Sequence, residues 1–232
     1  MTPNNINPEE GYCCNVVFAG SSVIKTTKES FSYKDAQARL DLLEDYAAAL
    51  AAEPLPVAPL TSATLTETEG KFALRFTMGL IPGPSVESLR GDERREAAGV
   101  IIGNLCAMSQ IKRYREPGIL RVPIDALLRN WHIDPTTKIP TLIDIYPPWS
   151  RDALGRIKYF REAEPRRWAE KVKGRLGNIV PYLVADIADK EFMSDQDAIE
   201  WGVSVLPPDD PKFNTFLLKR IKDYITRTHF FV

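Results

Sequence analysis

Sulfur and imidazole are scarce in this sequence, which holds three cysteines and two histidines among 232 residues. Cys13 and Cys14 are adjacent and Cys106 is remote from both, so the cysteines form neither a disulfide framework nor a metal-ligand pattern. An odd cysteine count without a framework is typical of a reducing compartment, and we expect a cytoplasmic protein. His132 and His229 are too far apart in the sequence to form a zinc site of recognisable spacing.

Long apolar runs and a surplus of one charge are also absent. No apolar stretch reaches the roughly 18 residues that predict a membrane span, and residues 1–10 lack the layout of a signal peptide. Thirty Lys and Arg against 31 Asp and Glu give a net charge of −1, whereas nucleic-acid binders normally carry a basic surplus. The basic residues between 166 and 175 fit a solvated helix face. We therefore expect neither a nucleic-acid nor a membrane partner, and the oligomeric state stays open.

The first 80 residues predict a small antiparallel sheet with one helix. Apolar residues recur at three- and four-residue steps from 33 to 52, which indicates an amphipathic helix. Strand-like runs on either side of Gly20 and of Gly70 are typical of hairpins, because glycine tolerates the backbone of a tight turn. The four expected strands are residues 15–18, 22–26, 61–67 and 71–78.

The composition changes at residues 81–85, where a Pro-Gly-Pro run forms a stiff connection that neither a helix nor a central strand tolerates. Helical patterns dominate the rest of the chain, and Asp92 is the expected N-cap of the first of them. These helices are expected at residues 92–114, 163–176, 179–188, 194–201 and 211–226. We predict an α+β protein with a β-rich lobe (1–80), a hinge (81–85) and a larger, mainly helical lobe (86–232).

Lys25, at the end of the second strand, is a candidate phosphate ligand. Side chains alternate along a strand, so Val23 and Lys25 share one face, and a lysine fixed there can reach a cleft and neutralise nucleotide phosphates. Glu44, near the apolar stripe of the helix, is the expected partner of this lysine, as in the Lys–Glu ion pair of kinases. Asp41 or Asp45 would fit that pattern almost as well. The alternatives are an exposed lysine on an edge strand and a solvated carboxylate on the helix.

Met78, Gly79 and Leu80 lead from an apolar strand into the Pro-Gly corner. A strand that ends at a lobe junction leaves backbone N–H and C=O groups that an adenine ring can use as an added edge. We expect these three residues to bind the adenine of a nucleotide. The alternative is a linker without a ligand.

Asp125 and Asn130 have the spacing of a phosphoryl-transfer loop. That chemistry needs a carboxylate to accept the proton of the attacking hydroxyl and a nearby oxygen ligand for Mg²⁺. The motif alone is commonplace, but Asp144 follows at the end of an apolar run, with a tight turn at 134–138 between them. The pattern predicts a hairpin with Asn130 and Asp144 at its two ends, where both could bind Mg²⁺. The alternative for Asp144 is a turn residue before Pro147.

In order and spacing, these motifs resemble the aminoglycoside phosphotransferase group of the protein-kinase-like superfamily. The resemblance runs over about residues 11–148, and its motifs are the strand lysine (23–25), the proline-marked entry to the next strand (55–59), the hinge (81–85), the catalytic loop (125–130) and the metal-binding aspartate (142–144). It implies a protein-kinase-like fold and transfer of the γ-phosphoryl group of ATP, with Mg²⁺, to a hydroxyl of a small metabolite or antibiotic. In that reaction Asp125 would be the base, Lys25 the phosphate anchor, and Asn130 and Asp144 the metal ligands.

The sequence departs from this family at three points. Pro123 stands where the catalytic loop usually has histidine, no G-x-G-x-x-G loop precedes Lys25, and Ile145 follows Asp144 in place of Phe. These departures leave a second function open, a pseudokinase that binds a nucleotide or a partner without turnover. Retention of all four candidate residues favours the enzyme, since a decaying site would be expected to lose one of them first.

Overall fold

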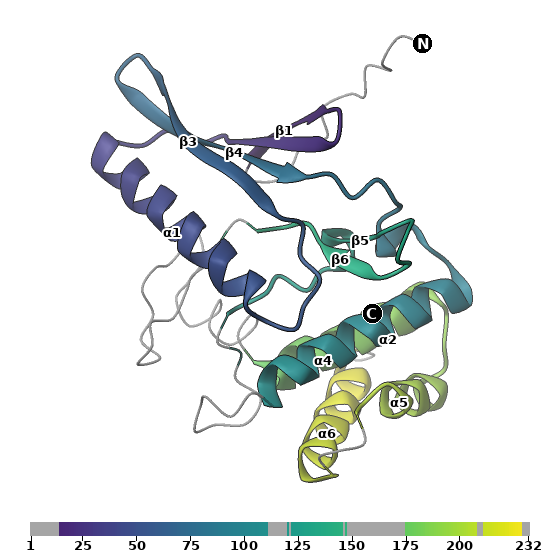
Figure 1. Ribbon diagram of the computed structural model, residues 1–232. Helices are drawn as coiled ribbons and strands as arrows, with labels where there is room; N and C mark the ends of the chain where they lie inside the picture. Colours follow the sequence, from purple (N-terminus) through teal and green to yellow (C-terminus); the bar gives the residue numbers. More distant parts are fainter. Residues whose placement is uncertain are drawn as a thin grey trace, which may run out of the picture.

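A computed structural model of the chain describes residues 14–110, 120, 122–145, 147, 175–207 and 211–228. The helix expected at 163–176 lies outside these ranges except for its last two residues, and the end of the helix expected at 92–114 lies outside them as well. The described part is an α+β structure whose sheet strands are antiparallel (Figure 1).

The first 80 residues form a four-stranded sheet covered on one face by a helix (Figure 1). The elements are β1 (Cys14–Ala19), β2 (Ser22–Thr27), α1 (Tyr33–Ala51), β3 (Leu60–Thr68) and β4 (Lys71–Gly79), and the strand order is β1-β2-β4-β3. Gly20 and Gly70 turn the two hairpins with φ of 62° and 74°, the left-handed region that favours glycine. Both predicted hairpins and the predicted helix are therefore confirmed.

Helix α1 packs on the sheet through one apolar stripe. Leu43, Tyr46 and Leu50 are at most 1% exposed, and their steps of three and four residues place them on one face. Every second residue near the end of β4 is buried as well, including Leu74 and Phe76. Burial of such side chains contributes about 1.5–3 kcal/mol each, so this interface fixes where α1 lies.

A short hairpin, β5 (Trp131–Ile133) and β6 (Pro140–Leu142), lies between the sheet and the remaining helices (Figure 1). On one side, Ala58 N–H donates to the carbonyl of Leu142 at 2.8 Å, and Leu142 N–H donates to that of Pro56 at 2.9 Å. On the other side, Ile133 N–H donates to Pro84 at 2.9 Å. Backbone bonds therefore tie the hairpin to two segments from the first 85 residues.

Gly83 is where the 80–85 connection meets β5. A Cβ added there would overlap the backbone carbonyl of Ile133, which cannot move without breaking the adjacent bond to Pro84. We expect Gly83→Ala to reduce the free energy of unfolding by about 1–3 kcal/mol, the usual cost of overpacking. Gly103→Ala is the matched control, because nothing lies within 4 Å of a Cβ at that helical position. Urea unfolding of both variants measures the difference, and equal stability of the two would contradict the close approach.

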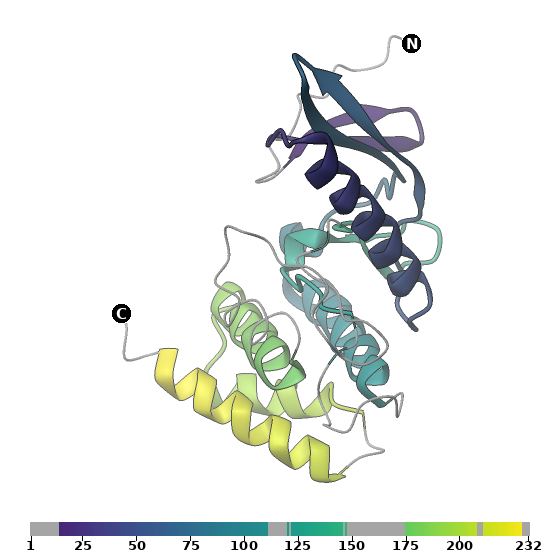
Figure 2. The same cartoon turned by 90° about the vertical axis from the view of Figure 1, so that its left-hand side faces the viewer.

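The rest of the described chain is mainly helical. After η1 (Val86–Ser88) come α2 (Gly91–Gln110), η2 (Leu128–Asn130), α4 (Leu176–Lys190), α5 (Asp195–Ser204) and α6 (Pro211–Thr228). Figure 2 shows these four α-helices at one end of the molecule and the sheet with α1 at the other. The division into two lobes with a hinge at 81–85 stays a prediction. No helix within the described ranges is both long and apolar enough to cross a membrane.

The beginning of α2 differs from the prediction. The helix begins at Gly91, so Asp92 lies in its first turn and is not the N-cap. Glu191 at the end of α4 takes the capping role: its Oε2 accepts from Gly91 N–H at 2.9 Å, and its Oε1 lies 2.7 Å from the guanidinium of Arg94. Arg94 is buried, so this ion pair joins α2 to α4 where solvent screens it little.

Candidate functional site

Asp125 lies on an irregular segment whose flanking residues are buried. Val122, Ile124 and Ala126 are at most 7% exposed, whereas Asp125 between them is only partly buried. Pro123 is buried too, so the core anchors the segment before and after Asp125. The carboxylate therefore lies at the boundary of the core.

Asn130 holds the same segment from its other end. Its side-chain Nδ2 donates to the backbone carbonyl of Asp125 at 3.2 Å, and its backbone N–H donates to Leu127 at 2.9 Å. Because the amide nitrogen is used on Asp125, the amide oxygen is the end of the side chain that remains suited to a cation. Asn130 thus closes the loop that carries Asp125.

The β5–β6 hairpin places Asp144 beside Asn130, as predicted for its two ends. Asn130 directly precedes β5, and Asp144 lies two residues beyond β6. The backbone N–H of Ile143 donates to the carbonyl of Asn130 at 2.8 Å, which continues the ladder past the last strand residue. Asp144 is partly buried. Ile143 is therefore bonded opposite Asn130, and Asp144 is the next residue in the chain.

Lys25 reaches this hairpin from the sheet. Its Nζ donates to the carbonyl of Ile143 at 3.0 Å, across 118 positions of sequence. Strand β2 lies between β1 and β4, and Lys25 is partly buried, so it is not an exposed residue of an edge strand. This bond holds the ammonium group against the backbone of the residue that precedes Asp144.

Glu44 is not the partner of Lys25. It lies on the exposed face of α1, while the buried positions 43 and 46 face the sheet, and no ion pair joins Glu44 to Lys25 in the described part of the chain. The reason is helical geometry: each residue turns the helix by about 100°, which carries position 44 off the buried stripe. The carbonyl of Ile143 takes the place expected for this carboxylate.

The amides of the expected adenine site are already used. Gly79 N–H donates to the carbonyl of Pro59 at 3.0 Å, and Leu80 N–H donates to that of Ser21 at 2.9 Å. Met78 is 1% exposed and lies in the sheet opposite Val23. The structure thus does not leave the N–H groups of Gly79 and Leu80 to an added adenine edge.

The side chains near this site that could bind a metal ion are oxygen donors. No group of three or more His, Cys, Asp and Glu side chains within the described residues could hold a metal ion. Asn130 and Asp144 offer an amide and a carboxylate oxygen, which fits Mg²⁺, because that ion retains waters and takes further oxygens from phosphates. The donor set does not fit zinc, which prefers thiolate and imidazole.

Two tyrosines near Asp125 were not singled out by the sequence. The hydroxyl of Tyr46 on α1 donates to the carbonyl of Pro123 at 2.6 Å. Burial raises the pKa of the Tyr182 phenol on α4, and the charges of Asp186 and, more weakly, Asp125 act in the same direction. Tyr46 is buried and Tyr182 is half-buried on its helix. The helical pattern of the sequence marks neither residue for a further role.

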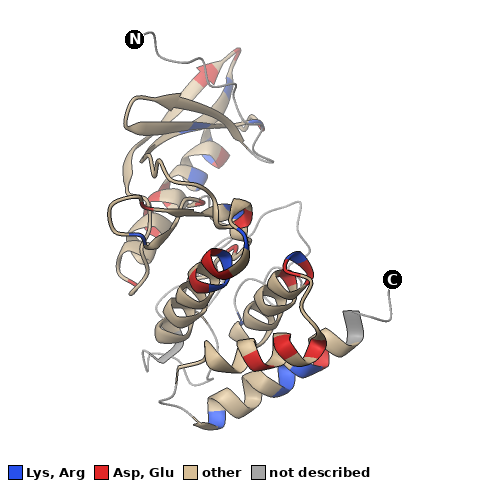
Figure 3. Cartoon of the chain, turned by 90° about the vertical axis from the view of Figure 1, so that its right-hand side faces the viewer, with Lys and Arg blue, Asp and Glu red and all other residues tan. Residues whose placement is uncertain are grey.

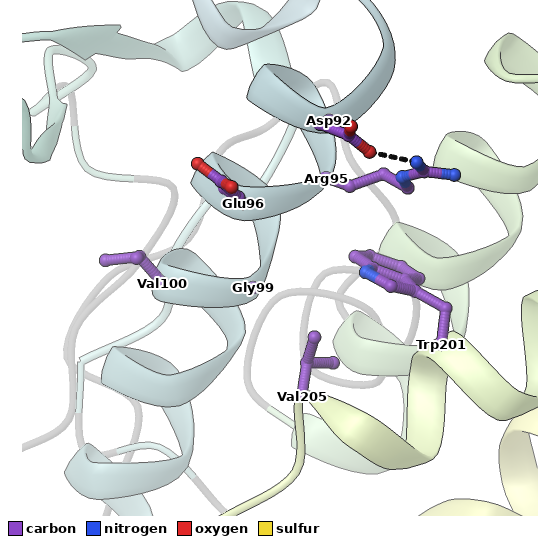
Figure 4. Close-up of a pocket in the computed structure, with 7 residues that line it drawn as sticks. All are labelled: Asp92, Arg95, Glu96, Gly99, Val100, Trp201 and Val205. Carbon is purple, nitrogen blue, oxygen red and sulfur yellow. Dashed lines mark hydrogen bonds and ion pairs between the residues drawn. The ribbon is translucent and has the colours of Figure 1, made fainter.

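A separate pocket of about 540 Å³ lies between α2 and α5 (Figure 4). It is lined by Asp92, Arg95, Glu96, Gly99, Val100, Trp201 and Val205. Arg95 is ion-paired with Asp92 at its edge, while Trp201 and Val205 form an apolar wall (Figure 4). None of the predicted site residues lines this pocket.

Charge on the helical end is mixed. Figure 3 shows acidic residues along α5 beside basic residues along α6. The exposed acidic residues are Asp195, Asp197 and Glu200, and the exposed basic residues of α6 include Lys212, Lys219 and Lys222. Opposite charges on adjacent helices offset one another, so these two helices do not present a surface of a single sign.

Comparison with known proteins does not assign a family. No family model matches the chain, and no curated protein matches it. Among solved structures, the bifunctional kinase-methyltransferase WbdD is similar, with 14% sequence identity and a TM-score of 0.48. The match covers 92% of this chain and 43% of that protein, so this chain spans less than half of its length. A likeness of this strength defines neither the fold family nor the activity of this chain.

Proposed function

We propose that this chain is a phosphotransferase with a two-lobed, protein-kinase-like fold that moves the γ-phosphoryl group of ATP to a hydroxyl of a small molecule. The observation that carries the proposal is the series of bonds from Lys25 to Ile143, from Ile143 to Asn130, and from Asn130 to Asp125. These bonds link Lys25 to Asn130 and Asp125, and Asp144 directly follows the bonded Ile143. A lysine, an asparagine and two aspartates are the types of group that phosphoryl transfer requires, which supports the proposal.

In the proposed reaction each group has one task. The acceptor hydroxyl attacks the γ-phosphorus while Asp125 takes its proton, and the bond to the β–γ bridging oxygen breaks with its electron pair leaving on ADP. An ammonium group has three N–H donors, and Lys25 uses one on Ile143, so the others can contact the phosphates. Asn130 and Asp144 would hold Mg²⁺, which supplies neutralisation of the charge on the phosphates.

Loss of the Lys25 charge tests the phosphate end of this proposal. We expect Lys25→Met to weaken Mg·ATP binding by about 10- to 100-fold, because a hydrogen bond to a charged group contributes about 1.5–3 kcal/mol. Isothermal titration calorimetry measures the affinity. The matched control is Lys28→Met, which removes an exposed lysine just beyond the same strand and should bind as the wild type does. Absence of Mg·ATP binding by the wild-type chain would contradict the proposed function itself.

A pseudokinase is the second candidate, and the occupied amides of Gly79 and Leu80 favour it. A chain that does not present these N–H groups to adenine would bind nucleotide weakly or use the fold to bind a partner. The two functions differ in a single-turnover assay with Mg·ATP and a panel of hydroxyl-bearing small molecules. Binding without transfer to any acceptor or to water favours the pseudokinase, and formation of a phosphorylated product favours the enzyme.

A further inference from the structure

Tyr46 links α1 to the segment that carries Asp125. The side chain is 1% exposed, and its hydroxyl donates to the carbonyl of Pro123 at 2.6 Å in a buried setting. The two residues are 77 positions apart, and Pro123 lies two residues before Asp125. A short hydrogen bond in a low-dielectric interior is electrostatically stronger than the same bond in water.

The Asp125 segment depends on such bonds because it lacks regular structure. Residues 123–127 belong to neither a helix nor a strand. Pro123 has no N–H, so its carbonyl is its only backbone hydrogen-bonding group, and Tyr46 bonds that group. On the other side of the catalytic carboxylate, Asn130 bonds the backbone carbonyl of Asp125. The side chains of Tyr46 and Asn130 therefore bond the backbone carbonyls of Pro123 and of Asp125, respectively.

We propose that Tyr46 is a positioning residue, whose hydroxyl sets the backbone before Asp125 and thereby the place of the general base. This inference rests on the proposed phosphotransferase function. Tyr46 acts through Pro123 and touches neither nucleotide nor acceptor, so its loss should affect the chemical step more than nucleotide binding. The bond that holds Lys25, the group assigned to the phosphates, runs from its Nζ to the carbonyl of Ile143 and not to Tyr46.

The test compares Tyr46→Phe with Tyr33→Phe. The first variant removes only the buried hydroxyl, and the second removes a hydroxyl from an exposed tyrosine on the same helix. For Tyr46→Phe we expect kcat to fall by about 10- to 100-fold, the range that a small misplacement of a reacting group causes, with the KM for Mg·ATP unchanged. Hydrogen exchange of the amides of residues 124–127 should become faster. Tyr33→Phe should match the wild type in all three measurements.

The outcomes separate this inference from the function on which it rests. If Tyr46→Phe keeps the wild-type kcat and exchange rates, the positioning role is wrong and the phosphotransferase proposal stands. A parallel change in kcat, KM and global stability would indicate a purely structural residue and would also overturn the inference. If the wild type transfers no phosphoryl group, both proposals fail, and exchange still reports whether the bond restrains the segment. If Tyr46→Phe does not fold, 4-fluorophenylalanine at position 46, which fills the space of the hydroxyl but has no O–H to donate, replaces it, and an unchanged kcat and exchange there would overturn the inference.

Discussion

Replacing Asp125 with alanine is expected to lower kcat by about 10²–10⁴-fold, the usual contribution of a positioned general base, while the affinity for Mg·ATP stays almost unchanged. Asn130 bonds the backbone carbonyl of Asp125 and not its carboxylate, so the loop closure survives the loss of the side chain. In the proposed reaction the base acts on the acceptor hydroxyl alone, so the groups assigned to the nucleotide should stay in place.

The measurement pairs single-turnover kinetics with calorimetric titration of Mg·ATP. Asp125→Asn serves as an isosteric second variant, because it keeps the size of the side chain and removes its ability to take a proton. Glu67→Ala, which deletes an exposed carboxylate on β3, controls for a general effect of charge. Wild-type turnover in both Asp125 variants would exclude this residue as the base.

Replacing Asp144 with alanine is expected to lower both the affinity for nucleotide and the turnover, unlike the replacement of Asp125. Asp144 is assigned to Mg²⁺, and even partners in the outer shell of a metal site cost about 10- to 100-fold in metal affinity when they are removed. A direct ligand should cost at least that much. The backbone should hold, because both bonding groups of the preceding residue are engaged, Ile143 N–H with Asn130 and Ile143 C=O with Lys25.

Magnesium dependence makes this prediction specific. With Mg²⁺ present, calorimetry should show weaker ATP binding by Asp144→Ala than by the wild type. With EDTA in place of Mg²⁺, the difference between the two proteins should largely disappear, because the missing carboxylate then has no ion to bind. An Asp144→Ala variant that binds Mg·ATP as tightly as the wild type would remove the metal assignment and leave the other residues untouched.

Much of the local structure could be predicted from the sequence. The spacing of apolar residues predicts α1 within a residue of its observed ends, and Gly20 and Gly70 mark the two turns of the sheet. The turn at 134–138 predicts the hairpin that sets Asn130 beside Asp144. These features depend on interactions between residues close together in the chain, which periodicity and turn composition encode directly.

Only the tertiary structure decided which distant groups meet. Lys25 bonds the carbonyl of Ile143 instead of Glu44, and Tyr46 bonds that of Pro123. Backbone carbonyls have no signature in the sequence, because every residue carries one, and their accessibility depends on the path of the chain. The cap of α2 is non-local for a different reason: the carboxylate of Glu191 supplies it from 100 positions away, where the local pattern favoured Asp92. The sequence by itself therefore determined most of the described elements and the candidate residues of the site, and packing of the sheet, hairpin and helices decided their partners.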